Sequence, residues 1–395
     1  MKQQQLLIPL LIMFSLLLST NTIIIFMSSN TVAINENKEV KNVLFVGGAG
    51  PNNYTIIQDA VDNATEGSTI FVYAGTYYEG VQINKTINIM GENRNTTIIN
   101  GGWYRGGFLF AADRINITEL TIINTTHAVL LLNSNHSKII NCSILNNQKY
   151  GIELVNSSYN QISDCYIFYN NLCGINIKSY SDYNSITNCL FSYNGVAIAL
   201  YDCSENNISY CKIGSDSGYG FHILNASNNN IQNCTLKGFG KAIEFLGNSD
   251  SNLVIGCEII NNYYGIIINN SESNLNTFHH NSFINNQIHA YDISENFWDN
   301  GAKGNYWDDY NGIDSNHDGI GDTPYNIPGG YNIDRYPLII QNDGGINNTM
   351  HSTSAIPPLS TEQTVILLFL IILFFVIILF VLIRKKKGRM VKKHE

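Results

Sequence analysis

The sequence predicts an all-β fold, a right-handed parallel β-helix solenoid with coils of about 23 residues, because two features recur at that interval. Six cysteines lie 22 to 24 residues apart, and each is followed eight or nine positions later by a small residue and an apolar–x–apolar triplet. Such a period is typical of repeat architectures whose units stack on their neighbours. The right hand follows from the general preference of parallel connections. These cysteines are Cys142, Cys165, Cys189, Cys211, Cys234 and Cys257.

The local patterns within and before the repeats predict the individual elements. Alternating β-branched residues indicate two or three short strands in each of roughly ten coils, and the Asn, Ser, Asp and Gly clusters between them indicate turns. An apolar stripe at helical spacing within Thr55–Ala64 predicts a short N-terminal capping helix, with strands following at Thr69–Tyr73 and Thr86–Met90. A leucine-rich repeat is the main alternative at this period, but isoleucine largely replaces leucine here.

The cysteine column is expected to be reduced and to point into the core. Stacked coils lie ~4.8 Å apart, whereas a disulfide requires Cβ atoms about 3.8 Å apart. Disulfides and a Cu(I) site of soft thiolates are the alternatives. Cys173 and Cys203 lie outside the column, and we expect them to be either a reactive pair or isolated residues.

Both ends of the chain carry apolar segments that predict export and anchoring. Val365–Ile383 contains no charged residue and is followed by seven basic residues. Nineteen residues at ~1.5 Å each span about 29 Å of hydrocarbon, and the basic tail predicts a cytoplasmic C-terminus. We therefore expect a single-pass cell-membrane protein with an extracellular ectodomain. The expected segments are a signal peptide or N-terminal anchor (1–33), a β-helix with its N-terminal cap (40–300), an acidic C-terminal cap (301–342), a linker (343–362), a transmembrane helix (363–383) and a basic cytoplasmic tail (384–395).

The ectodomain is acidic. Between Asn35 and Ser360 there are 29 acidic and 14 basic residues, a balance of −15. This charge argues against nucleic acid as a partner and favours cations and neutral or cationic surfaces. Asn-x-Ser/Thr sequons are frequent, and in an exported protein they are glycan acceptors or chance triplets of an Asn-rich chain. Examples are Asn53, Asn84, Asn124, Asn156, Asn225 and Asn347.

An acidic loop near the C-terminal end of the ectodomain matches part of a calcium-binding pattern. Asp314, Asn316, Asp318 and Asp322 occupy positions 1, 3, 5 and 9, with a glycine at position 6. Position 12 is Tyr325 instead of glutamate, so Asp308 or Asp309 would have to supply the missing carboxylate. The alternative interpretation is a hydrated acidic turn.

The outward positions of the repeats offer few catalytic groups. The residue between the two apolar positions of each triplet is expected to face outward, which gives Glu153, Asn176, Ala199, His222, Glu244, Ile267 and Asp292. Only His222 and Glu244 are titratable neighbours on adjacent coils, about 5 Å apart, and they are the catalytic candidates. A solvated surface pair is the alternative. Glu153 lies four coils from Glu244, ~19 Å away, too far for a carboxylate pair.

Two motifs outside the repeats resemble a known family. The N-terminal run Val46-Gly47-Gly48-x-Gly50-Pro51-Asn52-Asn53-Tyr54 and the later Gly75-Thr76-Tyr77-Tyr78-Glu79 resemble the cap of pectin-lyase-like β-helix proteins. The repeats and the ending Gly304-Asn305-Tyr306-Trp307-Asp308-Asp309-Tyr310 resemble NosD-like right-handed β-helix surface proteins of archaeal type. This resemblance implies copper delivery to a reductase, or carbohydrate binding and hydrolysis.

Together these features favour a membrane-anchored surface protein that binds polysaccharide or a cell-envelope partner without catalysis. Tyrosines recur along the repeats and suit contacts with sugar rings. A polysaccharide hydrolase or lyase is the first alternative, and a NosD-like copper-handling protein is the second. Calcium is the expected metal ion, because no copper motif is evident in the chain.

Overall fold

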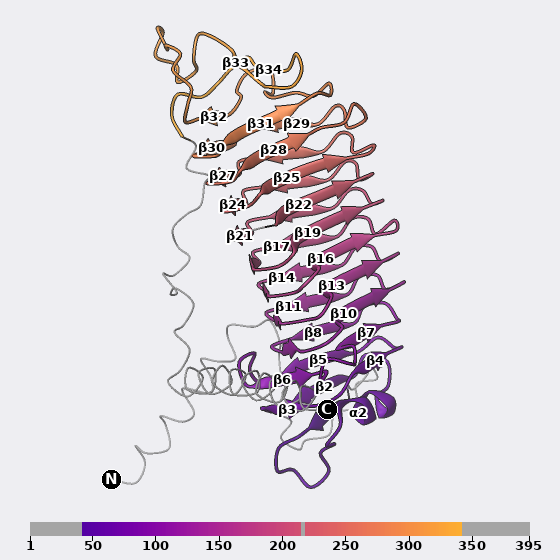
Figure 1. Ribbon diagram of the computed structural model, residues 1–395. Coiled ribbons are helices and arrows are strands. Elements are labelled where there is room, and N and C mark those ends of the chain that lie inside the picture. The colour runs from indigo at the N-terminus through magenta and orange to yellow at the C-terminus, as the bar shows by residue number, and fades with distance from the viewer. Residues whose placement is uncertain (1–41, 215–217, 342–395) are drawn as a thin grey trace, which may run out of the picture. The chain divides into compact units, whose positions relative to one another are not determined.

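The fold is a parallel β-solenoid formed by three sheets that run side by side (Figure 1). The computed structural model describes residues 42–214 and 218–341. The predicted signal segment, linker, membrane helix and basic tail lie outside these residues. Within the described part of the chain, no helix is long and apolar enough to cross a membrane. The all-β solenoid of about 23-residue coils is thus confirmed, with eleven strands in two of its sheets.

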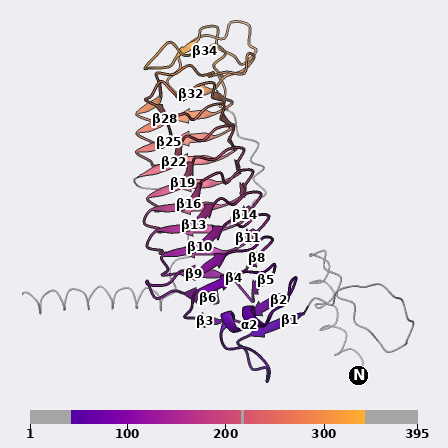
Figure 2. The same cartoon turned by 90° about the vertical axis from the view of Figure 1, so that its right-hand side faces the viewer.

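Each complete coil contributes one strand to each sheet, and every pairing between successive coils is parallel (Figure 2). The first sheet contains β1 (Val43–Val46), β2 (Thr69–Val72), β5 (Asn88–Gly91), β8 (Asn116–Thr118), β11 (Lys138–Ile140), β14 (Gln161–Ser163), β17 (Ser185–Thr187), β20 (Asn207–Ser209), β23 (Asn230–Gln232), β26 (Leu253–Ile255) and β29 (Thr277–His279). The second contains β3 (Gly75–Tyr77), β6 (Thr97–Asn100), β9 (Thr121–Ile123), β12 (Ser143–Leu145), β15 (Tyr166–Phe168), β18 (Leu190–Ser192), β21 (Lys212–Gly214), β24 (Thr235–Lys237), β27 (Glu258–Ile260), β30 (Ser282–Ile284) and β32 (Tyr306–Trp307). The third contains β4 (Val81–Ile83), β7 (Phe108–Phe110), β10 (His127–Leu132), β13 (Tyr150–Val155), β16 (Cys173–Lys178), β19 (Val196–Tyr201), β22 (Tyr219–Leu224), β25 (Lys241–Leu246), β28 (Tyr264–Ile268) and β31 (Ile288–Asp292).

Stacking of identical positions builds the core. Ile144 pairs with Ile167, which pairs with Phe191 on the next coil, and all three are buried. The cysteine column from Cys142 to Cys257 lies between the first and second sheets and is buried along its whole length. Each column removes a continuous strip of apolar surface from water, which a single coil could not do.

The two cysteines outside the column are also buried and free. Cys173 begins β16, whereas Cys203 follows the end of the neighbouring strand β19, so they lie at opposite ends of adjacent strands and do not form a pair. Burial raises the pKa of both thiols to about 12. The expectation of a reactive pair is therefore wrong, because the thiolate is the reactive form and burial disfavours it.

Ladders of buried asparagines line the turns between strands. In each ladder the Oδ1 of an asparagine accepts hydrogen bonds from the asparagine one coil earlier, and its Nδ2 donates a hydrogen bond to the asparagine one coil later. Asn229 donates its backbone N–H and its Nδ2 to Oδ1 of Asn252, at 2.9 and 3.1 Å. These bonds satisfy backbone groups at the points where the chain leaves a strand. The longest ladder consists of Asn160, Asn184, Asn206, Asn229, Asn252, Asn276 and Asn296.

Many corners of the coils hold a non-glycine residue at positive φ, and several of these are tyrosines. The rings of neighbouring corner tyrosines stack on one another: Tyr159 and Tyr183 lie 5.0 Å apart between centroids, and Tyr169 and Tyr193 lie 4.9 Å apart. A stacked ring offers an open face only at the end of its column. These corner tyrosines are therefore less available to sugars than their number in the sequence indicates.

Both ends of the described solenoid are covered. The helix α2 (Ile57–Asn63) buries Ile57, Ala60 and Val61, as predicted, while the carboxylate of Glu79 accepts from the first two backbone N–H groups of the helix. At the other end, residues after β32 fold back over the last coils and include the antiparallel pair β33 (Tyr325–Asn326) and β34 (Ile333–Asp334).

Candidate functional site

The outward face of the third sheet carries Glu153, His222 and Glu244, three of the residues that the sequence analysis singled out. From Glu153 to Ile267 the residues of the predicted row pair with one another in register. All of them except His222 are buried, although they were expected to be open to solvent. The last member of the row is Tyr291, which pairs with Ile267. Asp292 was wrongly placed in the row. It pairs with Ile268, is fully buried, and accepts a hydrogen bond from the indole of Trp298.

His222 and Glu244 are in contact, and Lys241 completes the cluster. Nδ1 of His222 lies 3.1 Å from Oε2 of Glu244, and Nζ of Lys241 donates to the other carboxylate oxygen at 2.6 Å. Glu244 is only 8% exposed, so a solvated surface pair does not describe it. Although burial raises the pKa of Glu244, the hydrogen bonds from His222 and Lys241 outweigh it and lower the pKa. The rings of Tyr201 and Tyr219 pack edge-on against His222.

A second cluster of the same kind lies four coils earlier. Glu153 contacts His127 at 3.3 Å and Lys178 at 2.8 Å, and Asn176 donates to it at 3.0 Å. Burial opposes ionisation of this carboxyl, but its hydrogen bonds to His127 and Lys178 lower its pKa to about 2. Tyr150 packs beside His127.

These two clusters do not resemble the acid and base of a glycosidase. Both carboxylates are ionised and hydrogen-bonded, so neither holds a proton to donate to a leaving group. They are separated by four coils, ~19 Å at ~4.8 Å per coil, whereas paired catalytic carboxylates lie within about 10 Å. Neither cluster therefore supplies the acid and base pair of such an enzyme.

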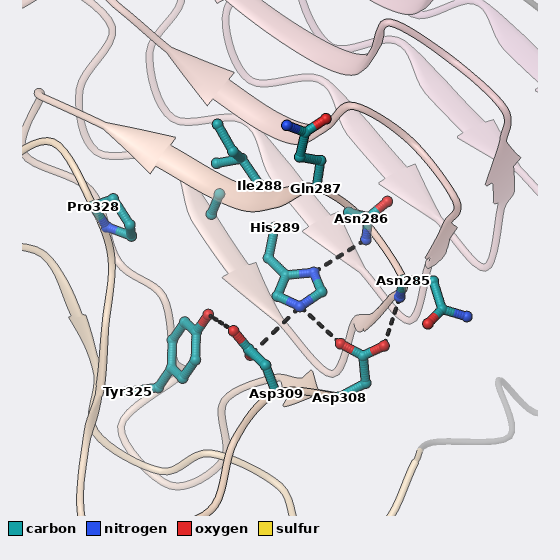
Figure 3. Close-up of a pocket in the computed structure, with 10 residues that line it drawn as sticks. Asn285, Asn286, Gln287, Ile288, His289, Asp308, Asp309, Tyr325 and Pro328 are labelled. Carbon is teal, nitrogen blue, oxygen red and sulfur yellow. Dashed lines mark hydrogen bonds and ion pairs between the residues drawn. The ribbon is translucent and has the colours of Figure 1, made fainter.

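A polar pocket of about 420 Å³ lies where the C-terminal segment folds over the last coils (Figure 3). Nε2 of His289 lies 2.8 Å from Asp308 and 3.4 Å from Asp309, while the hydroxyl of Tyr325 donates to Asp309 at 3.2 Å. His289 is buried on β31, and the two aspartates directly follow β32. Burial and the neighbouring Asp309 raise the pKa of Tyr325, so its hydroxyl stays protonated.

Two adjacent imidazoles form another group at the end of β29. The Nδ1 atoms of His279 and His280 lie 2.7 Å apart. Burial lowers the pKa of both rings, with the neighbouring His280 adding to the effect on His279. Both rings are therefore neutral at pH 7, the form that ligates metals.

The predicted calcium loop is an exposed turn held by its own side chains. Asp314 accepts from the backbone N–H groups of Asp318 and Gly319, and Asn316 donates to Asp318 at 2.9 Å. Asp322 accepts from Ser315. Asp308 and Asp309 are engaged in the pocket instead. Calcium binding by the loop stays a prediction.

Sequence reasoning missed the partners of the clusters and the whole pocket. Lys178 and Lys241 lie on the strands of residues already singled out, so charge on neighbouring outward positions was an available signal. His289, by contrast, meets Asp308 only because the chain folds back over the last coil, and no periodic pattern predicts that contact.

Two family models match the chain. Residues 61–237 match the model described as periplasmic copper-binding protein (NosD), and residues 179–320 match the right handed beta helix region. With the parallel solenoid, these matches confirm the resemblance expected from the sequence. Over residues 61–320 the chain resembles NosD-like right-handed β-helix proteins. None of the curated proteins compared with it gives a match.

Solved structures with similar folds include viral and bacterial β-helix proteins. ORF18 of Geobacillus virus E2 is 18% identical with a TM-score of 0.55, covering 70% of this chain; the NosD-like chain spans 64% of the viral protein. The A-module of mannuronan C-5 epimerase AlgE6 from Azotobacter vinelandii is 13% identical and has a TM-score of 0.46. The match covers 65% of this chain and 95% of the A-module. The tailspike gp49 of Acinetobacter baumannii bacteriophage Fri1, a capsular polysaccharide depolymerase, is 10% identical and has a TM-score of 0.47. The match covers 67% of this chain and 56% of the tailspike. These likenesses concern the fold alone.

Proposed function

We propose that this NosD-like protein binds an extended polysaccharide along the outward face of its third sheet and does not cleave it. The observation that carries the proposal is the pair of His–Glu–Lys clusters on this face, centred on Glu153 and Glu244, with half-buried tyrosines beside them. The tyrosines are Tyr150, Tyr201, Tyr219, Tyr264 and Tyr291.

The chemistry of this face fits a sugar polymer. Phenol rings supply apolar area with a polar tip, and the partly exposed lysines and imidazoles, which the buried carboxylates hold in place, supply hydrogen-bond partners for hydroxyl groups. The two clusters lie four coils apart along the solenoid, so an extended chain of sugar residues can contact both at once. Weak contacts that act together in this way add up by avidity.

Display at the cell surface would place this face in contact with the envelope. The proposal keeps the single-pass topology expected from Val365–Ile383 and the basic tail, with the ectodomain outside. Protease added to intact cells should remove the ectodomain and leave the tail. Protection of the ectodomain instead would contradict this topology.

Binding is tested with the purified full chain on arrays of neutral and acidic polysaccharides, followed by titration calorimetry on the best ligand. Tyr219→Ala and His222→Ala should each weaken binding about tenfold, the loss of ~1.4 kcal/mol. Tyr166→Ala, a change at an exposed tyrosine of β15 in the second sheet, is the matched control and should bind as wild type. Equal affinity of all four proteins would contradict the proposal.

The same preparations distinguish binding from catalysis. New reducing ends or unsaturated products that disappear in His222→Ala or Glu244→Gln would show a hydrolase or lyase. Binding without products supports the proposed function. If neither binding nor products are observed, a cell-envelope partner or a structural coat is the favoured function.

A second candidate function is copper handling, favoured by the facing imidazoles of His279 and His280. Their Nδ1 atoms lie 2.7 Å apart in a hydrogen bond, both rings are neutral at pH 7, and imidazole is a suitable ligand for Cu(II). The matched family model carries a copper-binding description, which supports this candidate. The buried cysteine column is less suited, because its thiols are enclosed in the core.

Copper binding is measured by titrating the full chain with Cu(II) and following the absorption of the metal–imidazole complex. His279→Ala should abolish this absorption, and His280→Asn should abolish it too. Asparagine is chosen at position 280 because it tolerates the positive φ there. His136→Asn changes an exposed histidine elsewhere that also has a positive φ, and serves as the matched control. Identical spectra for all variants would exclude the pair as the copper site.

A further inference from the structure

The pocket beside His289 carries two carboxylates whose charge is not neutralised by its other lining residues. Among the ten residues that line it, all within the described part of the chain, none is a lysine or arginine. The clusters at Glu153 and Glu244 differ in this respect, because each of those carboxylates contacts a lysine. The charge state of His289 therefore decides the charge of the pocket.

The asparagine ladder determines which nitrogen of His289 carries the proton. Asn286 accepts from Asn262 through Oδ1 and donates from Nδ2 to the carbonyl of Ile259 at 2.8 Å, which fixes the orientation of its amide. The same Nδ2 lies 3.3 Å from Nδ1 of His289. Since this neighbour is a donor, Nδ1 must accept, and the proton of the neutral ring lies on Nε2.

This tautomer has two consequences. Nε2–H donates to Asp308 and Asp309, so His289 orients both carboxylates. A nitrogen that carries a proton also cannot ligate a metal ion. Although the three residues are close enough to hold a cation, the ladder thus disfavours the imidazole as a metal ligand.

Other contacts hold the carboxylates in place and leave them facing the pocket (Figure 3). The backbone N–H of Asn285 donates to Asp308 at 2.6 Å, and the hydroxyl of Tyr325 donates to Asp309. The side chain of Asp309 is 58% exposed. The ring of Tyr325 stacks on that of Trp307, with the ring centroids 4.2 Å apart, and this contact fixes the aromatic side of the pocket. The volume of about 420 Å³ lies within the ~300 to 1,000 Å³ range of small-molecule sites.

We infer that this pocket binds one amino-sugar residue through its protonated amine. The ammonium group would lie against Asp308 and Asp309, while the amides of Asn285 and Gln287 would serve the ring hydroxyls. A charged donor between two carboxylates gives strong, short hydrogen bonds. This inference deepens the proposed function by naming a sugar class, and it places that sugar in the C-terminal pocket rather than on the sheet face.

The test compares glucosamine, N-acetylglucosamine and glucose as probes of the full chain at pH 6, by ligand-observed NMR with EDTA present. Glucosamine should bind at least tenfold more tightly than the other two, and its affinity should fall with added salt. Asp308→Asn and Asp309→Asn should each weaken glucosamine binding at least tenfold, whereas Asp59→Asn, an exposed change on α2, should not. Thermal unfolding of each variant verifies that it is folded.

Equal binding of glucosamine and glucose would overturn the inference, because the pocket would then not recognise the ammonium group. Binding of Ca²⁺ or Mn²⁺ without EDTA that is lost in Asp309→Asn, together with no glucosamine binding, would overturn it in favour of a metal site. Variants of the sheet face separate the two proposals: Tyr219→Ala should weaken polysaccharide binding and leave glucosamine binding unchanged. The failure of one proposal is therefore visible without the failure of the other.

Discussion

Asp334 accepts a hydrogen bond from the indole Nε1 of Trp307 at 2.9 Å, although the carboxyl of Asp334 is fully buried. The backbone N–H groups of Asn305 and Tyr336 also donate to this carboxyl. Burial outweighs these bonds and raises the pKa of Asp334 to about 6. The protonated form of Asp334 therefore stabilises the folded state more than the ionised form does.

The first prediction concerns pH. Because the folded-state pKa of Asp334 exceeds its ordinary value of 3.8, the folded state binds more protons between pH 4 and 6, and stability falls as pH rises through this window. The shift of about two pKa units corresponds to about 3 kcal/mol. The unfolding free energy of wild type relative to Asp334→Asn should decrease by roughly that amount from pH 4 to 7, followed by tryptophan fluorescence.

The comparison with Asp334→Asn cancels the other titrating groups. Glu153, with its pKa lowered to about 2, contributes stability that is lost only as pH falls below about 4.5. His279 and His280, with lowered pKa values, oppose folding as pH falls below about 6.5. A difference between the two proteins that stays constant with pH would show that Asp334 is ionised as easily when folded as when unfolded.

The second prediction concerns the asparagine ladder. Asn252→Ala removes the acceptor of two bonds from Asn229 and the donor of bonds to Ala226 and Asn276. Leaving buried polar groups without partners costs about 1–3 kcal/mol each, so we expect a loss of at least 2 kcal/mol in chemical denaturation. Asn95→Ala, an exposed change outside the ladder, should alter stability by less than about 0.5 kcal/mol. Similar losses in both variants would mean that the ladder adds no stability of its own.

The sequence predicted the coil period, the cysteine column and most of the outward row because these depend on repetition. A column such as Ile144, Ile167 and Phe191 has a signature in every coil. The ladder through Asn252 also repeats, but its asparagines were interpreted as turn formers, since a turn residue and a stacked amide have the same composition. The contact of His289 with Asp308 arises outside the repeats, where one chain reversal determines the geometry and leaves no pattern.

The third prediction concerns the cysteine column. Cys211→Asp should destabilise the solenoid by more than 4 kcal/mol, because an unpaired carboxylate would replace a buried thiol between Cys189 and Cys234. Cys211→Ala is the control and should cost far less, since it leaves only a small cavity. Denaturant unfolding of both variants measures the difference. An aspartate variant as stable as wild type would place the column at the surface.

The fourth prediction concerns the acidic loop, which we propose binds Ca²⁺ through Asp314, Asn316, Asp318 and Asp322. In the structure these side chains accept from or donate to groups of the loop itself, as in the contact of Asp314 with the N–H of Gly319. A cation would replace part of these bonds and order the C-terminal segment. At a calcium concentration one hundred times the Kd, binding to the folded state alone adds about 2.7 kcal/mol.

The full chain should therefore melt at a higher temperature with Ca²⁺ than with a chelator, and Asp318→Asn should abolish the difference. Asp309→Asn separates the loop from the pocket, because Asp309 contacts His289 and Tyr325 rather than the loop residues named above. If calcium raises the melting temperature of Asp318→Asn but not of Asp309→Asn, the ion binds in the pocket. If calcium raises the melting temperature of neither wild type nor any variant, the loop is a hydrated acidic turn. Its carboxylates then serve only to accept hydrogen bonds from the loop's own backbone N–H groups.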